Sequence, residues 1–247
     1  MAMIKGDSGN NKLDGTISDD VIYGMQGRDT IFGGAGNDTI YGGNGSVDPN
    51  DVADKIWADV GDDLVYGNGG NDEISLSYGK DTAYGGTGDD AIYGGDGNDQ
   101  ISGNTGSDTI FGDSGDDTLF GGSSEVDPTD AGDDIRGGNG NDKIFGNGGN
   151  GGNGGNDVID GGNGNDTVYG GMGNDKIIGR TGNDQLFGNE GDDGFNVDAF
   201  VDSVTLTGGG GRDIFGFWSS TQQISNVPVG HATITDLNRS VHEFIAF

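Results

Sequence analysis

The chain has no cysteine, two histidines and three prolines among its 247 residues. Without cysteine it can form neither disulfides nor thiolate metal sites, and two histidines are too few for a conventional zinc site. Cations are scarce as well, since 11 Lys and Arg stand against 42 Asp and Glu, for a net charge of -31. This balance argues against nucleic acid and anionic membrane surfaces as partners, because both would repel the chain.

Long apolar runs are also missing from the sequence. No apolar run approaches the roughly 20 residues that a transmembrane helix needs, so we expect no membrane span. Residues 1–5 lack the apolar core of a signal peptide, and we expect them to be a short leader. Export by the usual amino-terminal route is therefore not expected.

Glycine, by contrast, is abundant, and many of the 56 glycines belong to a nine-residue pattern, Gly-Gly-x-Gly-x-Asp-x-(apolar)-x. Residues 33–41 are a full copy. Counted from residue 6, nineteen copies run to residue 196, and one further, isolated copy begins at Gly208. Such strict periodicity is typical of stacked repeat units rather than of a single globular core.

The pattern itself predicts the local structure of each copy. Glycine allows the positive-φ backbone of a tight turn, and the x-(apolar)-x triplet has room for one brief strand. We therefore predict an all-β parallel β-roll, in which two copies complete one coil and same-side turns stack at about 4.8 Å. The eighth position should point inward, and one buried side chain in nine residues is too thin a core to fold the chain alone.

The sixth position is aspartate in every copy except the first, which has Asn11. Carboxylates and backbone carbonyls are the ligands of hard cations, calcium above all. A cation midway between stacked turns would lie about 2.4 Å from each turn, which suits calcium better than magnesium at about 2.0 to 2.1 Å. The predicted metal ligands are Asp20, Asp29, Asp38, Asp54, Asp63, Asp72, Asp81, Asp90, Asp99, Asp108, Asp117, Asp133, Asp142, Asp157, Asp166, Asp175, Asp184, Asp193 and Asp213.

Aspartates two copies apart should be neighbours in two rows, one from Asp29 to Asp193 and one from Asp20 to Asp184. Eight neighbouring pairs in each row leave room for about sixteen Ca²⁺ ions, whose charge would nearly cancel the formal charge of the chain. The alternative is that the aspartates only form Asx turns beside glycine. Turn chemistry alone, however, does not require Asp over Asn at nineteen of twenty positions.

Over residues 6–196 these copies resemble the RTX, or hemolysin-type calcium-binding, family. The resemblance implies a parallel β-roll with calcium between the turns, bound by the sixth-position carboxylates together with turn carbonyls. It also implies that the chain folds outside the cell, where calcium is abundant, so we expect an extracellular or cell-surface location. Secretion would use a type I ABC exporter that reads an uncleaved C-terminal signal.

Residues 197–247 are expected to form a C-terminal cap and type I secretion signal. Residues 208–215 and 232–237 resemble, more loosely, motifs in the C-terminal cap of serralysin-type proteases and alginate epimerase modules, with Ala232 in place of an aspartate. Residues 243–247 resemble the acidic-then-apolar terminus of such exported proteins. The alternative for this terminus is an ordinary capping strand.

The ninth position should face outward, and in the even copies it forms a nearly continuous aromatic ladder. Its members are Tyr23, Tyr41, Tyr66, Tyr84, Ser102, Phe120, Phe145, Tyr169 and Phe187. The ladder offers a surface for glycan stacking or self-association, since a long apolar strip usually marks a contact. The alternative is cross-strand packing that only stiffens the sheet.

Three copies, 42–57, 121–136 and 146–160, are longer than nine residues, and all are odd-numbered, so their insertions should project from one edge. The first two insertions share the motif Val-Asp-Pro-x-Asp at residues 47–51 and 126–130. These loops add metal ligands or a contact surface, or they reflect an internal duplication in a tolerant surface loop.

Enzyme activity is not expected. No segment outside the repeats and the tail is long enough for a catalytic domain, and His231 and His242 form no His-Glu-x-x-His motif. We predict a secreted calcium-binding β-roll with calcium-dependent folding and a structural or surface-matrix role. The alternative is the C-terminal module of a larger exported enzyme or adhesin, in which the roll serves folding and export.

Overall fold

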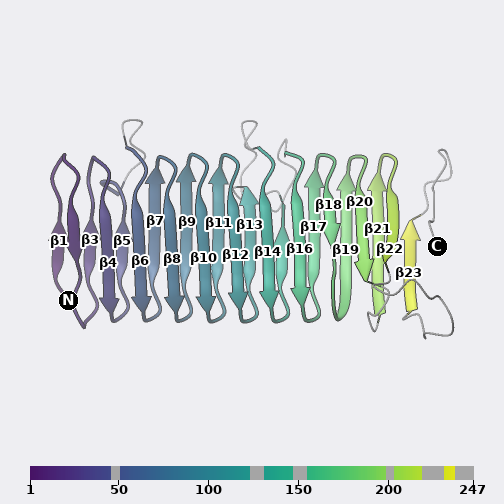
Figure 1. The fold of residues 1–247 in the computed structure, drawn as a ribbon, viewed down its shortest axis with the longest axis horizontal. Helices are drawn as coiled ribbons and strands as arrows, with labels where there is room; N and C mark the ends of the chain where they lie inside the picture. Colours follow the sequence, from purple (N-terminus) through teal and green to yellow (C-terminus); the bar gives the residue numbers. More distant parts are fainter. Residues whose placement is uncertain (46–50, 123–130, 147–154, 199–202, 219–230, 237–247) are drawn as a thin grey trace.

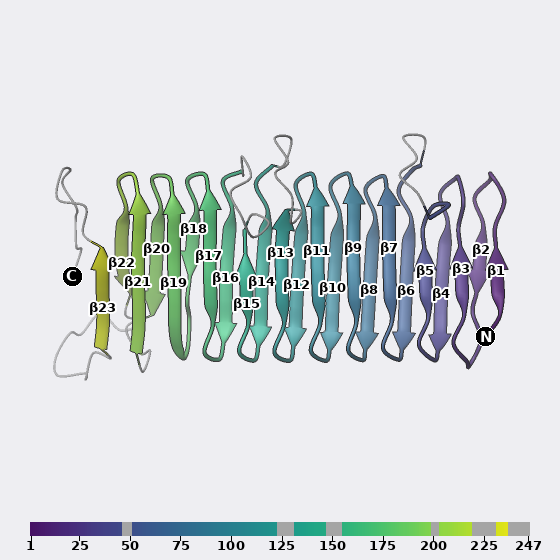
Figure 2. The same ribbon diagram turned by 180° about the vertical axis from the view of Figure 1, so that it is seen from behind.

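The computed structural model describes residues 1–45, 51–122, 131–146, 155–198, 203–218 and 231–236. These residues form two parallel β-sheets that lie face to face along an elongated roll (Figure 1). Seen from either side, the strands follow one another along the long axis in chain order (Figure 2). No helix in these ranges has the length and apolarity needed to span a bilayer.

Sheet A contains the odd-numbered strands of the described residues. They are β1 (Met3–Lys5), β3 (Val21–Tyr23), β5 (Thr39–Tyr41), β7 (Leu64–Gly69), β9 (Thr82–Thr87), β11 (Gln100–Thr105), β13 (Thr118–Gly122), β15 (Lys143–Phe145), β17 (Thr167–Met172), β19 (Asn183–Glu190), β21 (Ser203–Gly210) and β23 (His231–Asp236).

Sheet B contains the even-numbered strands. They are β2 (Lys12–Asp14), β4 (Thr30–Ala35), β6 (Lys55–Val60), β8 (Glu73–Tyr78), β10 (Ala91–Asp96), β12 (Thr109–Ser114), β14 (Asp134–Asn139), β16 (Val158–Asn163), β18 (Lys176–Ile178), β20 (Gly194–Asp198) and β22 (Ile214–Trp218).

Each strand pairs in parallel with the strand two further along the chain, so two copies of the repeat complete one coil. On sheet B, Ile92 of β10 is in register with Ile74 of β8 and with Ile110 of β12. On sheet A, Ile101 of β11 is in register with Ala83 and Leu119. The repeat period therefore sets the register, and the predicted parallel β-roll is confirmed.

The core between the two sheets consists mainly of eighth-position side chains, which come from both sheets and are at most 9% exposed. They are Leu13, Ile22, Ile31, Ile40, Ile56, Val65, Ile74, Ala83, Ile92, Ile101, Ile110, Leu119, Ile135, Ile144, Ile159, Val168, Ile177, Leu186 and Phe195. β-branched residues dominate this set because they pack well on a pleated surface.

Most strands are longer than the triplet that the sequence predicts. β7, for example, runs six residues, from position seven of one copy to position three of the next. The second and third positions of the next copy remain in the strand because they pair with a neighbouring coil, as Asn68 does with Gly86 and Gly69 with Thr87 of β9. At the second position the backbone turns to positive φ, as at Gly34 (φ 102°), and Met25 (φ 88°) and Arg180 (φ 55°) adopt the same region. The positive φ is therefore common to the second position, and glycine is favoured there but not required.

In the structure, the roll extends beyond both of its predicted boundaries, residues 6 and 196. Residues 3–5, expected to be part of a leader, form β1, in which Ile4 is in register with Ile22 of β3. After residue 196, β21, β22 and β23 continue the two sheets, and Phe215 of β22 stacks on Phe195 at 4.9 Å. The tail residues 243–247 lie outside the described residues.

Candidate metal centre

The sixth-position aspartates lie in the turns that join the two sheets, in two rows on opposite edges of the roll. The first row, where sheet A leads into sheet B, contains Asp29, Asp54, Asp72, Asp90, Asp108, Asp133, Asp157, Asp175, Asp193 and Asp213. The second row, where sheet B leads into sheet A, contains Asp20, Asp38, Asp63, Asp81, Asp99, Asp117, Asp142, Asp166 and Asp184. All are at most 4% exposed, which is unusual for a carboxylate.

Within each row, a carboxylate reaches back to the preceding coil. Asp99 Oδ1 accepts a hydrogen bond from the backbone N–H of Asp81 at 2.9 Å, and Asp117 Oδ1 accepts one from Asp99 at 2.8 Å. The same bond recurs along both rows with lengths of 2.6 to 3.1 Å. Asp213 continues the first row, because its Oδ1 accepts the N–H of Asp193. The pairing of aspartates two copies apart is therefore found in the structure.

In many of these aspartates the second carboxylate oxygen accepts no hydrogen bond from the described residues. Within the described residues, Oδ2 is buried and accepts no hydrogen bond in Asp29, Asp38, Asp54, Asp63, Asp72, Asp81, Asp90, Asp99, Asp117, Asp142, Asp166, Asp175, Asp184 and Asp193. Burial raises the pKa of Asp72 to about 9 and that of Asp90 to about 8. A buried charged oxygen without a partner is costly, so a row of them favours either protonation or a bound cation.

Glycine at the first position keeps a space beside most of these Oδ2 atoms. A Cβ atom added to Gly94 would lie 2.7 Å from Asp99 Oδ2 and 2.5 Å from the carbonyl oxygen of Gly112 in the next coil. Real Cβ atoms do not approach oxygens so closely, so a side chain is excluded where two oxygens face the same point. The other glycines whose Cβ would meet both a row Oδ2 and a carbonyl oxygen are Gly24, Gly33, Gly42, Gly67, Gly85, Gly103, Gly112, Gly121, Gly137, Gly146, Gly170 and Gly188.

The fifth position provides an internal comparison. It forms a second ladder on the exposed side of the turns, in which Asn98 Oδ1 accepts the N–H of Asp116 at 3.0 Å and Asp116 Oδ1 accepts the N–H of Asn141 at 2.7 Å. Asn and Asp both occur in this ladder because one acceptor oxygen is enough. The sixth position holds Asp in all but one copy, so it requires more than turn formation. This argues against the Asx-turn alternative.

The first coil differs from those that follow. Asn11 Oδ1 accepts the N–H of Asp7 at 2.7 Å, and Asn11 Nδ2 donates to Asp7 Oδ1 at 3.1 Å. Asp20 accepts through both oxygens, from Ala2 N–H at 2.6 Å and from Thr16 N–H at 2.7 Å. These bonds, chiefly that from Ala2, lower the pKa of Asp20, in contrast to the raised values further along the rows. Both carboxylate oxygens of Asp20 thus accept hydrogen bonds, and in this respect Asp20 differs from the predicted ligands whose Oδ2 accepts none.

A metal ion at these rows would need two kinds of ligand. Within the described ranges, no three His, Cys, Asp or Glu side chains lie close enough to hold a metal ion by themselves. Each coil instead supplies one carboxylate per edge beside backbone carbonyls, which is the donor set of calcium rather than zinc. The residues that would hold calcium are the row aspartates whose Oδ2 borders a first-position glycine. When bound there, calcium would neutralise the buried carboxylates.

One carboxylate outside the pattern joins the first row. Asp51, from the first insertion, is 8% exposed, and its negative charge contributes to raising the pKa of Asp54 and Asp72, after the larger effect of burial. Its signal in the sequence was the repeated Val-Asp-Pro-x-Asp motif, which indicated added ligands as one of two interpretations. The other residues of the first motif, 47–50, and the whole of the second, 126–130, lie outside the described residues.

The aromatic ladder lies on the outer face of sheet A, away from both rows. Tyr66 stacks on Tyr41 at 5.0 Å and on Tyr84 at 5.2 Å, with ring planes within 12° of each other. The faces of these rings are therefore covered by their neighbours, which favours the stiffening interpretation over glycan stacking along the ladder.

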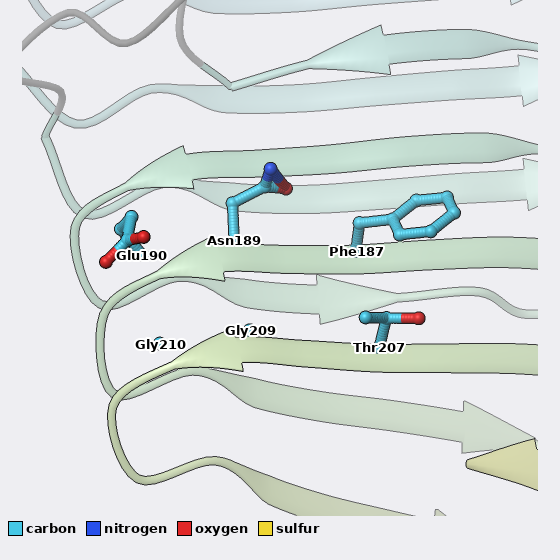
Figure 3. Close-up of a pocket in the computed structure, with 6 residues that line it drawn as sticks. All are labelled: Phe187, Asn189, Glu190, Thr207, Gly209 and Gly210. Atoms are coloured by element: carbon cyan, nitrogen blue, oxygen red, sulfur yellow. The ribbon is translucent and has the colours of Figure 1, made fainter. Parts of the chain in front are cut away.

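The ladder ends at Phe187, whose partner in register on β21 is Thr207. A hollow of about 520 Å³ lies there between β19 and β21, with Glu190 over the bare backbone of Gly210 (Figure 3). No row aspartate lines it, so this hollow is separate from the metal centre.

The repeat pattern also matches a family model. The model describes four copies of the RTX calcium-binding nonapeptide repeat, and it matches residues 3–31, 14–46, 50–74, 75–110, 93–124, 128–150, 152–177 and 169–204. No curated protein matches the chain. The matched segments cover most of the chain and contain both rows of aspartates up to Asp193. The chain therefore belongs to the family of RTX calcium-binding nonapeptide repeat proteins, and its repeats support calcium binding.

Proposed function

We propose that this protein is secreted in an unfolded state and that calcium binding outside the cell folds it into the roll. The observation that supports this most directly is the set of buried Oδ2 atoms that accept no hydrogen bond within the described residues. Most copies contribute a single apolar side chain to the core, so burial alone offsets little of the chain entropy and charge repulsion. Calcium binding would then be coupled to folding, as in other metal-dependent small domains.

The proposed location is extracellular or at the cell surface, reached through a type I ABC exporter. Support comes from the membership in the RTX family, whose proteins are typically secreted. The segment proposed to carry the export signal, 243–247, lies outside the described residues. An expression test with and without residues 237–247, in a host that carries a type I exporter, would decide whether this tail directs secretion.

For the secreted roll we propose a structural or surface-matrix role without catalysis. The elongated shape, the repetitive surface and the stacked rings on sheet A suit a stiff spacer. The alternative, a C-terminal module of a larger exported enzyme or adhesin, shares the calcium-coupled folding and differs in what precedes the roll. Purification of the native protein and measurement of its mass would separate the two.

Calcium-coupled folding is tested by circular dichroism during a calcium titration of chelator-treated protein. We expect little regular structure at neutral pH without calcium and a cooperative gain of β signal as calcium is added. Magnesium at equal concentration is the control, and it should not replace calcium because it requires shorter, octahedral coordination. A full β signal in excess chelator at neutral pH would contradict the proposal.

A further inference from the structure

Two copies of the repeat begin with a side chain where every other copy begins with glycine. These residues are Ala58 on β6 and Leu76 on β8, two strands that pair with each other in sheet B. Both side chains are fully buried and belong to the hydrophobic core. The two copies occupy neighbouring coils on the same edge of the roll.

The aspartates of these two copies are Asp63 and Asp81, which are neighbours in the second row. The N–H of Asp63 donates to Asp81 Oδ1 at 2.7 Å, so the hydrogen-bond ladder passes through them unchanged. Their Oδ2 atoms are buried and accept no hydrogen bond in the described part of the chain. The coils therefore stack normally, and what changes is the space beside Oδ2.

That space can be gauged from glycine copies in the same row. A Cβ atom added to Gly94 would lie 2.7 Å from Asp99 Oδ2, and one added to Gly33 would lie 2.8 Å from Asp38 Oδ2. By the geometry of the repeat, the methyl group of Ala58 and the larger side chain of Leu76 take this position in their own copies. Side-chain carbon atoms thus fill the space beside Oδ2 that glycine leaves open in the other copies.

We propose that calcium does not bind in the second row between Asp63 and Asp81. The second row is then two separate calcium-binding stretches, whereas the first row continues from Asp29 to Asp213. The reason is that calcium takes six to eight oxygen ligands, which an interval lined by hydrocarbon does not supply. This inference rests on calcium binding by the aspartate rows, and it concerns where within the rows the ions lie.

The first test compares matched double variants of the two rows. Asp54→Asn with Asp72→Asn alters the first row, and Asp63→Asn with Asp81→Asn alters the second row in the adjacent copies. Asparagine keeps the Oδ1 acceptor of the ladder and removes the charge. Bound calcium is counted by native mass spectrometry and by equilibrium dialysis at saturating calcium.

We expect the first-row variant to lose at least one ion more than the second-row variant, because the interval between Asp63 and Asp81 holds no ion to lose. Equal losses in the two variants would overturn the proposal. If neither variant loses an ion, the assignment of calcium to the rows fails, and this inference fails with it. A larger loss from the first-row variant supports both.

The second test replaces Ala58 and Leu76 by glycine and so reopens the space beside Oδ2 of Asp63 and Asp81. Ala58→Gly combined with Leu76→Gly should add at least one bound ion, whereas Gly94→Ala in an intact stretch of the same row should remove at least one. Circular dichroism at saturating calcium reports whether each variant folds. A folded Ala58→Gly/Leu76→Gly protein with an unchanged number of ions would overturn the proposal, and if this variant does not fold, the asparagine comparison decides.

Discussion

The carboxylate of Asp99 accepts, through Oδ1, a 2.9 Å hydrogen bond from the backbone N–H of Asp81 in the preceding coil. Its other oxygen, Oδ2, is buried and accepts no hydrogen bond among the described residues. One side chain thus joins two coils and presents a charged oxygen to the interior of the turn. Because this division recurs along both rows, the side chains that join the coils are also those that we propose as calcium ligands.

Replacement of Asp99 by Asn should separate these two roles. The amide oxygen can still accept the N–H of Asp81, but the charge is lost, so we expect at least one fewer bound calcium and a higher calcium concentration at the folding midpoint. Calcium stoichiometry by equilibrium dialysis checks this. The matched control is Asn98→Ala, which removes an exposed fifth-position hydrogen bond worth about 0.5–1.5 kcal/mol and should not change the number of ions. Equal stoichiometry in Asp99→Asn and Asn98→Ala would contradict the assignment.

The calcium-free chain should fold more readily at pH 5 than at pH 8. Burial raises the pKa of Asp63, Asp117 and Asp175 to about 7, and that of Asp72 to about 9, from an ordinary value of 3.8. The folded state therefore binds more protons than the unfolded chain. This contribution to stability is complete below the ordinary pKa and is lost as the pH rises through the range of about 6 to 9.

Circular dichroism in calcium-free buffer from pH 8 to pH 5 measures this effect, and the β signal should grow as the pH falls. Calcium binding should show the opposite trend, because protons compete for the same carboxylates. The calcium midpoint should therefore rise on acidification. A calcium-free β signal that is stronger at pH 8 than at pH 5 would reverse the expected sign and exclude the explanation by buried carboxylates.

Deletion of residues 197–247 should raise the calcium concentration needed for folding and promote self-association. In the intact chain, β21 covers the edge of β19, and β22 covers β20, where Phe215 stacks on Phe195. Without them, β19 and β20 lose the strands that pair with their edges, and unpaired strand edges template pairing with other chains. Calcium titration and analytical ultracentrifugation test both effects. A truncated roll that folds at the same calcium concentration and stays monomeric would show that this segment does not protect the end of the roll.

Replacement of Tyr66 by Ala should lower stability without changing the number of bound ions. Tyr66 stacks on Tyr41 and Tyr84, and such aromatic pairs contribute about 0.5–1.5 kcal/mol each beyond the area they bury. We therefore expect a loss of about 1–3 kcal/mol in the free energy of unfolding at saturating calcium, measured by denaturant titration. Tyr78→Ala is the control, since Tyr78 is 60% exposed and should matter little. Similar losses in the two variants would argue against a stabilising ladder.

The architecture could be predicted from the sequence because nearly every copy contains the same turn residues and the same apolar strand position. One glycine pattern per nine residues, followed by one apolar residue such as Ile101, leads to a single solution in which Ile101 stacks between Ala83 and Leu119. The ligand class followed from composition, since a chain without cysteine and with aspartate at a fixed position offers oxygen ligands alone. The length of the strands was less predictable, because the backbone groups that pair with the glycine segments belong to other coils.

The sequence alone predicts the parallel roll, the inward apolar residues and an aspartate at the same place in nearly every copy. Which of these aspartates have a buried Oδ2 that accepts no hydrogen bond among the described residues became known from the structure. Asp20 and Asp38 look alike in the sequence, yet Asp20 accepts hydrogen bonds through both oxygens and Asp38 through Oδ1 alone within the described residues. Asp213, likewise isolated in sequence, joins the first row only because β21 and β22 continue the sheets. The physical reason is that each row is built from groups about 18 to 25 residues apart, so the partner of an oxygen is set by coil stacking rather than by its own copy.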